Sequence, residues 1–314
     1  MHGHEQCSGC NLCLLVCPVW HRTRDMRLTP RGRAKALQQG ARAEDLADSI
    51  AQCTLCGACA PVCPENIDLI GMMLALRRAQ PLARSAAPAV ATTTKMPPHP
   101  ASATLLLPGA ALRGDPARLK RSVALLEQQG PVAVADDDGA DIAFCTETGA
   151  PLEEARLARF FKGLQGAGRI VIGDGMMLAL LKRARLDGRA GGRLIGLGEA
   201  LSALAAVQEK LLASDLYVIE PRAFHADYER LVGHYDGLRA RRGCAMNLDL
   251  QRIAIPTTAG AAQHLLGLTG IDVAAQARWI LEGRKVERIV VEDLCDRDAF
   301  AGVSDRPVLH LSDL

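Results

Sequence analysis

The chain has 314 residues, a formal net charge of +2 and a hydrophobic fraction of 49%, with few aromatic residues. This length accommodates two domains with aliphatic cores, and the charge gives no basic excess that would indicate nucleic-acid binding. No run approaches the roughly 18 apolar residues of a membrane span, and no apolar signal segment opens the chain, so we expect a cytoplasmic protein without a transmembrane segment.

Eight of the eleven cysteines lie in two copies of one motif before residue 64. Each copy has the spacing C-x2-C-x2-C-x3-C-P, in which three thiolates hold one [4Fe-4S] cluster and the fourth ligates its neighbour. The doubled motif predicts two [4Fe-4S] clusters with crossed ligands. The first is assigned to Cys7, Cys10, Cys13 and Cys63, and the second to Cys53, Cys56, Cys59 and Cys17.

Two other uses of cysteine fit the motif less well. Structural zinc needs four ligands, usually in two pairs, and has no need of a third cysteine at the same interval or of a Cys-Pro exit. Disulfides require an oxidising compartment, and the clustering of cysteines indicates metal ligation in a reducing one. The pattern therefore favours iron–sulfur clusters.

The segments next to the motifs predict helices. Strong helix formers run from Arg33 to Gln39 before Gly40, and the pattern resumes over residues 44–52. After the second motif, apolar residues recur at helical spacing from Ile67 to Leu74, with Asp68 placed to suit the helix dipole. We expect residues 1–80 to form a helical domain that carries both cluster loops.

Residues 81–103 are rich in proline and alanine and predict a linker. From residue 104 to 314 short apolar runs alternate with amphipathic stretches, which is typical of an α/β domain. Three pairs of matching segments in the same order predict two similar repeats, about 104–201 and 215–314, related by a pseudo-twofold axis. The expected strands are 104–107, 132–135, 142–144, 169–172, 193–195, 216–219, 252–255, 288–291 and 308–311.

The motifs, their long helical spacer and the segment Thr29-Pro-Arg-Gly-Arg33 resemble the iron–sulfur subunits of glycolate oxidase, lactate-utilisation, anaerobic glycerol-3-phosphate dehydrogenase and heterodisulfide reductase systems. The resemblance implies an α-helical ferredoxin fold for the first domain. It also implies a carboxy-terminal region of two cysteine-rich repeats, called CCG domains, that can hold a further metal or iron–sulfur centre.

This sequence departs from the CCG pattern. Alanine follows Gly109 where a cysteine is expected, Cys145 keeps one cysteine of a Cys-Cys-Gly, and Cys295 lies near a Cys-x2-Cys position. The corresponding segments at 173–176, 220–222 and 256–258 have no cysteine. Two leftover thiols do not make a four-ligand site, so we expect this domain to have lost the third centre. We expect Cys145, Cys244 and Cys295 to be small buried residues.

A basic cluster lies between the motifs and has two interpretations. It could raise the reduction potentials of the clusters or dock an acidic partner, or it could be an ordinary solvated helix face. The cluster consists of Arg22, Arg24, Arg27, Arg31, Arg33 and Lys35.

No substrate-converting residues are identified, so the sequence predicts a non-catalytic electron-transfer subunit of an oxidoreductase complex. We expect it to pass single electrons between a flavoprotein dehydrogenase, of the 2-hydroxy-acid or glycerol-3-phosphate type, and a downstream acceptor. That acceptor could be membrane- or quinone-linked, in which case partners would hold the protein at the periphery of the inner membrane. Two alternatives stay open: a heterodisulfide-reductase-like subunit whose α/β domain itself binds a ligand or metal, and a redox-sensing or assembly protein.

Overall fold

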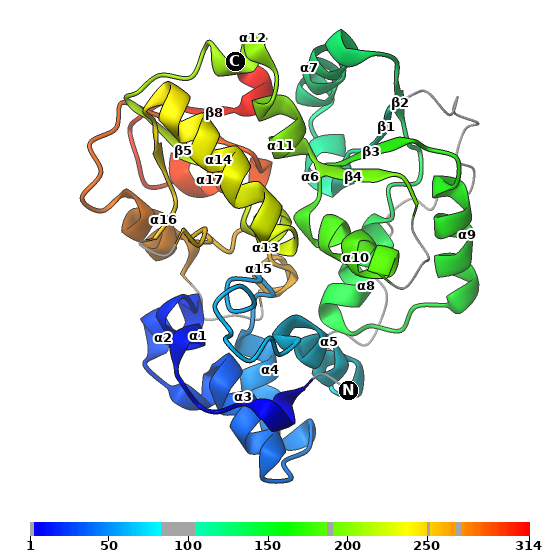
Figure 1. Cartoon of the computed structure of the whole chain (residues 1–314), viewed down its shortest axis with the longest axis vertical. Coiled ribbons are helices and arrows are strands. Elements are labelled where there is room, and N and C mark those ends of the chain that lie inside the picture. Colours follow the sequence, from blue (N-terminus) through cyan, green and yellow to red (C-terminus); the bar gives the residue numbers. More distant parts are fainter. Residues whose placement is uncertain (1–2, 83–103, 187–190, 250–251, 268–271) are drawn as a thin grey trace.

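The computed structural model describes residues 3–82, 104–186, 191–249, 252–267 and 272–314. Figure 1 shows a helical amino-terminal domain below two α/β halves, with the second cysteine loop directed toward the junction between the halves. The predicted linker lies outside the described residues from position 83 onward. Within the described ranges, no helix combines the length and apolar character needed to cross a membrane.

Short helices build the amino-terminal domain, as the helical spacer predicts. Asp68 caps the last of them, because its side chain accepts a hydrogen bond from the Gly71 N–H at 2.8 Å. Ile50 and Met73 are fully buried and share one apolar cluster with Ile142 of the α/β region, so the two parts have a continuous core. The elements are η1 (His4–Gln6), α1 (Leu12–Leu15), α2 (Pro18–Thr23), η2 (Met26–Leu28), α3 (Pro30–Gln38), η3 (Glu44–Leu46), α4 (Ala47–Gln52) and α5 (Leu69–Ala79).

The Pro-Arg-Gly-Arg segment forms the first turn of α3 for identifiable reasons. Thr29 is the N-cap and accepts from the Gly32 N–H at 3.2 Å, and Pro30 takes the first helical position, where no N–H is needed. A Cβ on Gly32 would lie 2.0 Å from the Met26 carbonyl oxygen, so only glycine fits there. Arg33 is buried and donates to the Leu28 and Ser49 carbonyl oxygens, both at 3.0 Å.

The first α/β half contains a four-stranded parallel sheet in the order β2-β1-β3-β4. Its central strands are apolar on both faces, as buried parallel strands require, and Leu105 pairs with Ile170. The elements are β1 (Thr104–Leu107), α6 (Gly109–Arg113), α7 (Pro116–Leu126), η4 (Glu127–Gln129), β2 (Val132–Val134), α8 (Ala140–Thr148), α9 (Glu154–Leu164), β3 (Arg169–Ile172), α10 (Gly175–Leu186), β4 (Arg193–Gly196), α11 (Leu197–Ser202) and α12 (Ala205–Gln208).

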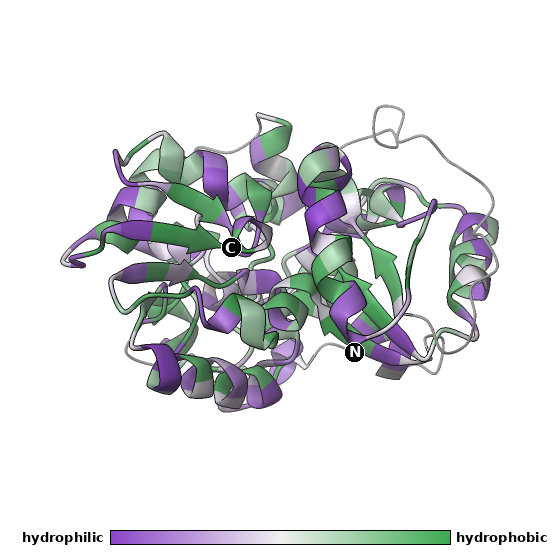
Figure 2. Cartoon of the chain, turned by 90° about the horizontal axis from the view of Figure 1, so that it is seen from above, coloured by the Kyte–Doolittle hydropathy of each residue, from purple (hydrophilic) through white to green (hydrophobic). Residues whose placement is uncertain are grey.

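The second half contains another four-stranded parallel sheet, in the order β6-β5-β7-β8. Leu216 pairs with Ile289 at its centre. Figure 2 shows apolar strands inside and hydrophilic residues on the outer helices in both halves. The elements are β5 (Asp215–Val218), α13 (Pro221–Ala226), α14 (Tyr228–Arg242), β6 (Ala245–Met246), α15 (Ala262–Leu265), α16 (Val273–Leu281), β7 (Arg288–Val291), α17 (Leu294–Ala301), β8 (Val308–His310) and η5 (Leu311–Asp313).

Two of the expected strands were wrong. Residues 142–144 belong to helix α8, which follows Gly139 in the left-handed conformation and ends before Gly149 in the same conformation. A short apolar run does not by itself distinguish a buried helix from a strand. Residues 252–255 make one antiparallel bridge, Leu248 to Ala254, and the strand at this edge is the shorter β6. The side chain of Asn247 instead bonds the Ile219 backbone and the Ile255 carbonyl there.

Candidate metal centres and the adjoining pocket

The two cysteine loops share one backbone conformation. Gly9 in the first loop and Leu55 in the second stand at equivalent positions, with φ values of 83° and 52°. Two residues further on, Asn11 and Gly57 have φ values of 71° and 81°. Left-handed residues at these positions turn successive N–H groups toward the inside of a loop, which is how backbone nests stabilise anionic centres. The repeated spacing therefore produces two similar anion-binding loops.

The first cysteine set surrounds one cavity. Cys7, Cys10 and Cys13 of the first loop line it together with Cys63 at the end of the second motif. Burial raises the pKa of the Cys13 thiol to about 11, a hydrogen bond from the Arg31 backbone opposes this rise, and the nearby Cys17, Cys10 and Cys7 add to it. Four thiols converging on one cavity fit the ligand set of a [4Fe-4S] cluster.

The cysteines assigned to the second cluster also lie close together. They are Cys53, Cys56 and Cys59 of the second motif and Cys17 of the first. Burial raises the pKa of the Cys59 thiol well above its usual range, and the nearby sulfurs of Cys56, Cys53, Cys17 and Cys13 raise it further. Burial likewise raises the pKa of Cys56 to about 12, against hydrogen bonds from the Ala58 backbone and Thr54. Buried thiols of this kind become thiolates when a metal supplies the positive charge, so the set fits a cationic iron centre.

These sets differ from single-ion sites. Within the part of the chain that the structure describes, no three or more His, Cys, Asp or Glu side chains are arranged to hold one metal ion. In a [4Fe-4S] cube four irons alternate with four sulfide ions at the corners, and each iron binds one thiolate, so the thiolates lie further apart than around one zinc ion.

Residues of α3 support the first loop. Lys35 Nζ donates to the Cys7 carbonyl oxygen at 2.6 Å and to Gln38 Oε1 at 2.8 Å, and Gln38 also donates to the Cys7 carbonyl. Arg27, by contrast, has a side chain 89% exposed and pairs with Asp25. The basic cluster therefore divides into buried or loop-bound members, among them Arg33 and Lys35, and a solvated remainder.

Helix α5 of the amino-terminal domain and helix α13 of the α/β domain support the second loop. Arg77 of α5 is fully buried and donates to the carbonyl oxygens of Cys53 and Glu147. His225 of α13 bonds the Cys56 carbonyl oxygen through Nδ1 at 2.7 Å and accepts from the Ala254 N–H at Nε2. A carbonyl only accepts, so His225 is the neutral Nδ1–H tautomer, and burial lowers its pKa to about 4.

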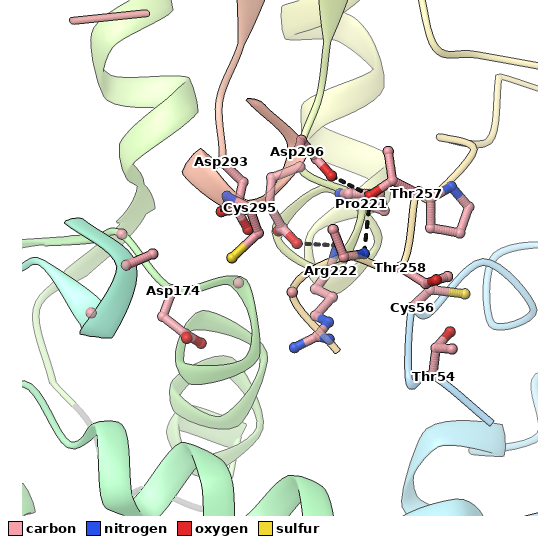
Figure 3. A pocket seen from close by; sticks show the side chains of 18 of the residues that line it. Thr54, Cys56, Asp174, Pro221, Arg222, Thr257, Thr258, Asp293, Cys295 and Asp296 are labelled. Atoms are coloured by element: carbon pink, nitrogen blue, oxygen red, sulfur yellow. Dashed lines mark hydrogen bonds between the residues drawn. The ribbon is translucent and has the colours of Figure 1, made fainter. Parts of the chain in front are cut away.

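A pocket lies at the junction of the two halves and the second loop. It is reached by the segments that follow β1, β3, β5 and β7, where the strand order of each sheet switches and open α/β sheets bind ligands. Thr54 and Cys56 of the second loop also line it, and Figure 3 shows them on the side opposite Asp174, Asp293 and Cys295.

The pocket collects the positions at which the sequence departs from the CCG pattern. Ala110, Asp174, Arg222 and Thr257 line it, together with Cys295, which the sequence keeps. No signal within the sequence indicated that these scattered segments meet beside a cluster ligand, because their convergence depends on the packing of three separate parts of the chain.

The remaining cysteines have different surroundings. Cys145 and Cys244 are buried, at 3% and 1% exposure, which confirms the prediction for them. Cys295 is half-buried in the pocket, so the prediction of a small apolar residue was wrong there. Asp293, burial and Asp296 all raise the pKa of its thiol well above the usual range.

Comparison with known proteins identifies the class of the amino-terminal domain. Residues 3–67 match the family model of the 4Fe-4S dicluster domain, which covers about a fifth of the chain. Neither a search of curated proteins nor a search of solved structures gave a match. The protein is an iron–sulfur protein with a ferredoxin-like amino-terminal domain that binds 4Fe-4S through its cysteines, followed by helical and α/β structure with two parallel sheets. Its role is electron transfer.

Proposed function

We propose that the protein holds two [4Fe-4S] clusters with crossed ligands and relays single electrons between a flavoprotein dehydrogenase and a downstream acceptor. The observation that carries the proposal is the cavity that Cys63 of the second motif shares with Cys7, Cys10 and Cys13 of the first. When bound, the clusters supply one-electron redox chemistry. The residues of the chain fix their position, donate hydrogen bonds to the sulfurs and control access of water.

The α/β domain in this proposal is a scaffold of two related repeats, 104–201 and 215–314, that has lost a third metal centre. The equal strand orders of the two sheets support the relation. The replacement of cysteine by Asp174, Arg222 and Thr257 around the pocket supports the loss.

The proposed flavoprotein partner rests on the resemblance to iron–sulfur subunits of dehydrogenase systems. A dehydrogenase that oxidises a 2-hydroxy acid or glycerol 3-phosphate removes two electrons at a flavin, and a pair of one-electron centres accepts them singly. The protein would act in the cytoplasm, at the periphery of the inner membrane when its acceptor is membrane- or quinone-linked.

Iron counting and EPR test the relay. Protein purified anaerobically together with its partners should contain about eight irons per chain and show the signals of two interacting [4Fe-4S] clusters after reduction. Adding a 2-hydroxy acid to the complex should reduce both clusters, whereas the isolated chain should not respond. About four irons per chain would contradict two clusters, and substrate oxidation by the isolated chain would contradict the relay.

A further inference from the structure

The pocket beside the second loop is small, and several carboxyl groups line it. Its cavity measures about 110 Å³, so it suits a ligand of a few heavy atoms. The residues that line it come from both α/β halves and from the ferredoxin-like domain, which makes the cavity a property of the assembled chain. Figure 3 shows that Asp174 and Asp293 approach it from the two different halves.

Carboxyl groups outnumber basic groups in the lining. Among the lining residues that the structure describes there are four carboxyl groups, those of Asp174, Glu220, Asp293 and Asp296, and one guanidinium, that of Arg222. Arg222 is already engaged, because its Nη atoms donate to Glu147 at 3.1 and 3.2 Å. Burial raises the pKa of Asp296 to about 8, and the charge of Asp293 adds to the rise. The lining therefore holds too few basic groups to pair with all four carboxyl groups in their ionised form.

Thr258 supplies an independent sign of a ligand. This pocket-lining residue is buried, at 7% exposure, and within the described structure its Oγ1 has no hydrogen-bond partner. Its backbone is left-handed, with φ at 69°, which is costly for a β-branched side chain. A strained residue with an unsatisfied buried hydroxyl is expected where a ligand supplies the missing hydrogen bond.

We propose that this pocket binds a small organic cation with N–H donors, of the primary ammonium type, through Asp174, Asp293 and the Thr258 hydroxyl. Carboxylates and a hydroxyl accept hydrogen bonds from an ammonium group and compensate its charge. The same carboxylates repel anions. A single metal ion fits less well, because the described residues do not form a three-ligand set for one.

A ligand in the pocket should change the reduction potential of the second cluster. Cys56 lines the same cavity, so a bound cation would stabilise the reduced state of a cluster held there and raise its reduction potential. This coupling rests on the proposed function, whereas binding itself does not. The cluster of the first loop should respond less, because its cavity is lined by other residues.

Calorimetric titration of the full chain, purified anaerobically with its clusters, tests the site with methylammonium chloride as the probe. We expect saturable binding at one site and weaker binding of tetramethylammonium, which has no N–H donor. Asp293→Asn and Asp174→Asn should each weaken binding about tenfold or more, because each removes a charge-assisted hydrogen bond. Thr258→Val should weaken it less, and Asp305→Asn, which changes an exposed carboxylate, should leave it unchanged.

Several outcomes would overturn the proposal. These are the absence of saturable binding to the native chain, equal weakening by Asp305→Asn, preference for acetate or phosphate, and displacement of methylammonium by stoichiometric Mg²⁺ or Zn²⁺. Measurement on the native chain keeps the test decisive if a variant does not fold. Iron content, measured on the same sample, reports separately on the proposed function. A potentiometric titration should then show an upward shift of one cluster and not of both.

Discussion

The two cysteine loops have the same spacing and the same left-handed positions, yet the residues between their cysteines lie in opposite surroundings. Ser8 and Leu12 of the first loop are exposed, whereas Thr54, Leu55 and Ala58 of the second are buried. The first loop therefore faces solvent, and the second lies against the α/β domain. The same cysteine spacing thus occurs once in exposed surroundings and once in a loop that borders the pocket of the α/β domain.

The two loops also differ in the residues that surround their cysteines. Cys10 is exposed, and the neighbouring Leu12 and Leu15 are 38% and 52% exposed, so the first loop presents apolar side chains at the surface. The second loop instead has protein hydrogen bonds on its carbonyls from Arg77 and His225. Surroundings of this kind set cluster potentials through hydrogen bonding, charge and solvent exposure.

Loss of one ligand from each loop gives the largest expected contrast. Cys59→Ser should reduce the iron content from about eight to about four per chain and lower the stability by about 3 kcal/mol, because metal binding at a buried site is part of the folding free energy. Cys10→Ser should also lose iron but lower the stability by only about 1 kcal/mol, because its loop is exposed. Anaerobic thermal unfolding with iron analysis compares them, and equal destabilisation would break the contrast.

Stability measured over a pH series should report the titration of a buried carboxyl group, that of Glu292. Burial raises the pKa of Glu292 to about 7, although it accepts hydrogen bonds from Tyr217, Tyr235 and the Glu220 N–H. The folded protein then binds the proton more tightly than the unfolded chain. The contribution of Glu292 to stability is therefore greatest below about pH 4.5 and falls as the pH rises to about 7.

Glu292→Gln removes that titration. Relative to the native chain, the variant should gain roughly 3 kcal/mol of stability between pH 4.5 and 7, measured as the difference in anaerobic unfolding between the two proteins. Glu287→Gln, at an exposed position, is the control and should show no such gain. A parallel pH dependence of native and Glu292→Gln protein would argue against a buried neutral carboxyl.

The buried arginine should matter more than its exposed neighbour. Arg77→Met removes the hydrogen bonds to the Cys53 and Glu147 carbonyl oxygens and should lower the stability by about 2 kcal/mol. Arg78→Met, one position along the same helix but exposed, should change it by less than about 0.5 kcal/mol. Chemical denaturation under anaerobic conditions makes the comparison, and similar losses in both variants would indicate that the Arg77 contacts contribute little.

Single hydrogen bonds to the loops should give the smallest effects. His225→Gln removes the Nδ1–H donor to the Cys56 carbonyl and should lower the potential of the second cluster by tens of millivolts. Lys35→Met removes the donor to the Cys7 carbonyl and should do the same to the first. Spectroelectrochemistry with EPR distinguishes the two clusters, and a shift of both by either variant would show that the loops are not independently tuned.

The sequence alone determined the features that depend on neighbouring residues. Cysteine spacing predicted the iron–sulfur loops, because a cube needs three thiolates from one tight turn. Periodicity and the charge of Asp68 near a helix start predicted the helix over residues 69–79, and runs such as Arg169–Ile172 predicted the buried strands. These signals are local, so they can be read before the fold is known.

The tertiary structure decided which distant segments meet. Residues 142–144 became helix because Gly139 and Gly149 delimit it, and the apolar run could not reveal this. Contacts between residues far apart in the chain bury one loop and leave the other exposed. They also produce the hydrogen bonds of Arg77 and His225 to the second loop and the acidic pocket beside Cys56. Such contacts depend on how the sheets and helices pack, and that packing leaves no periodic trace in the sequence.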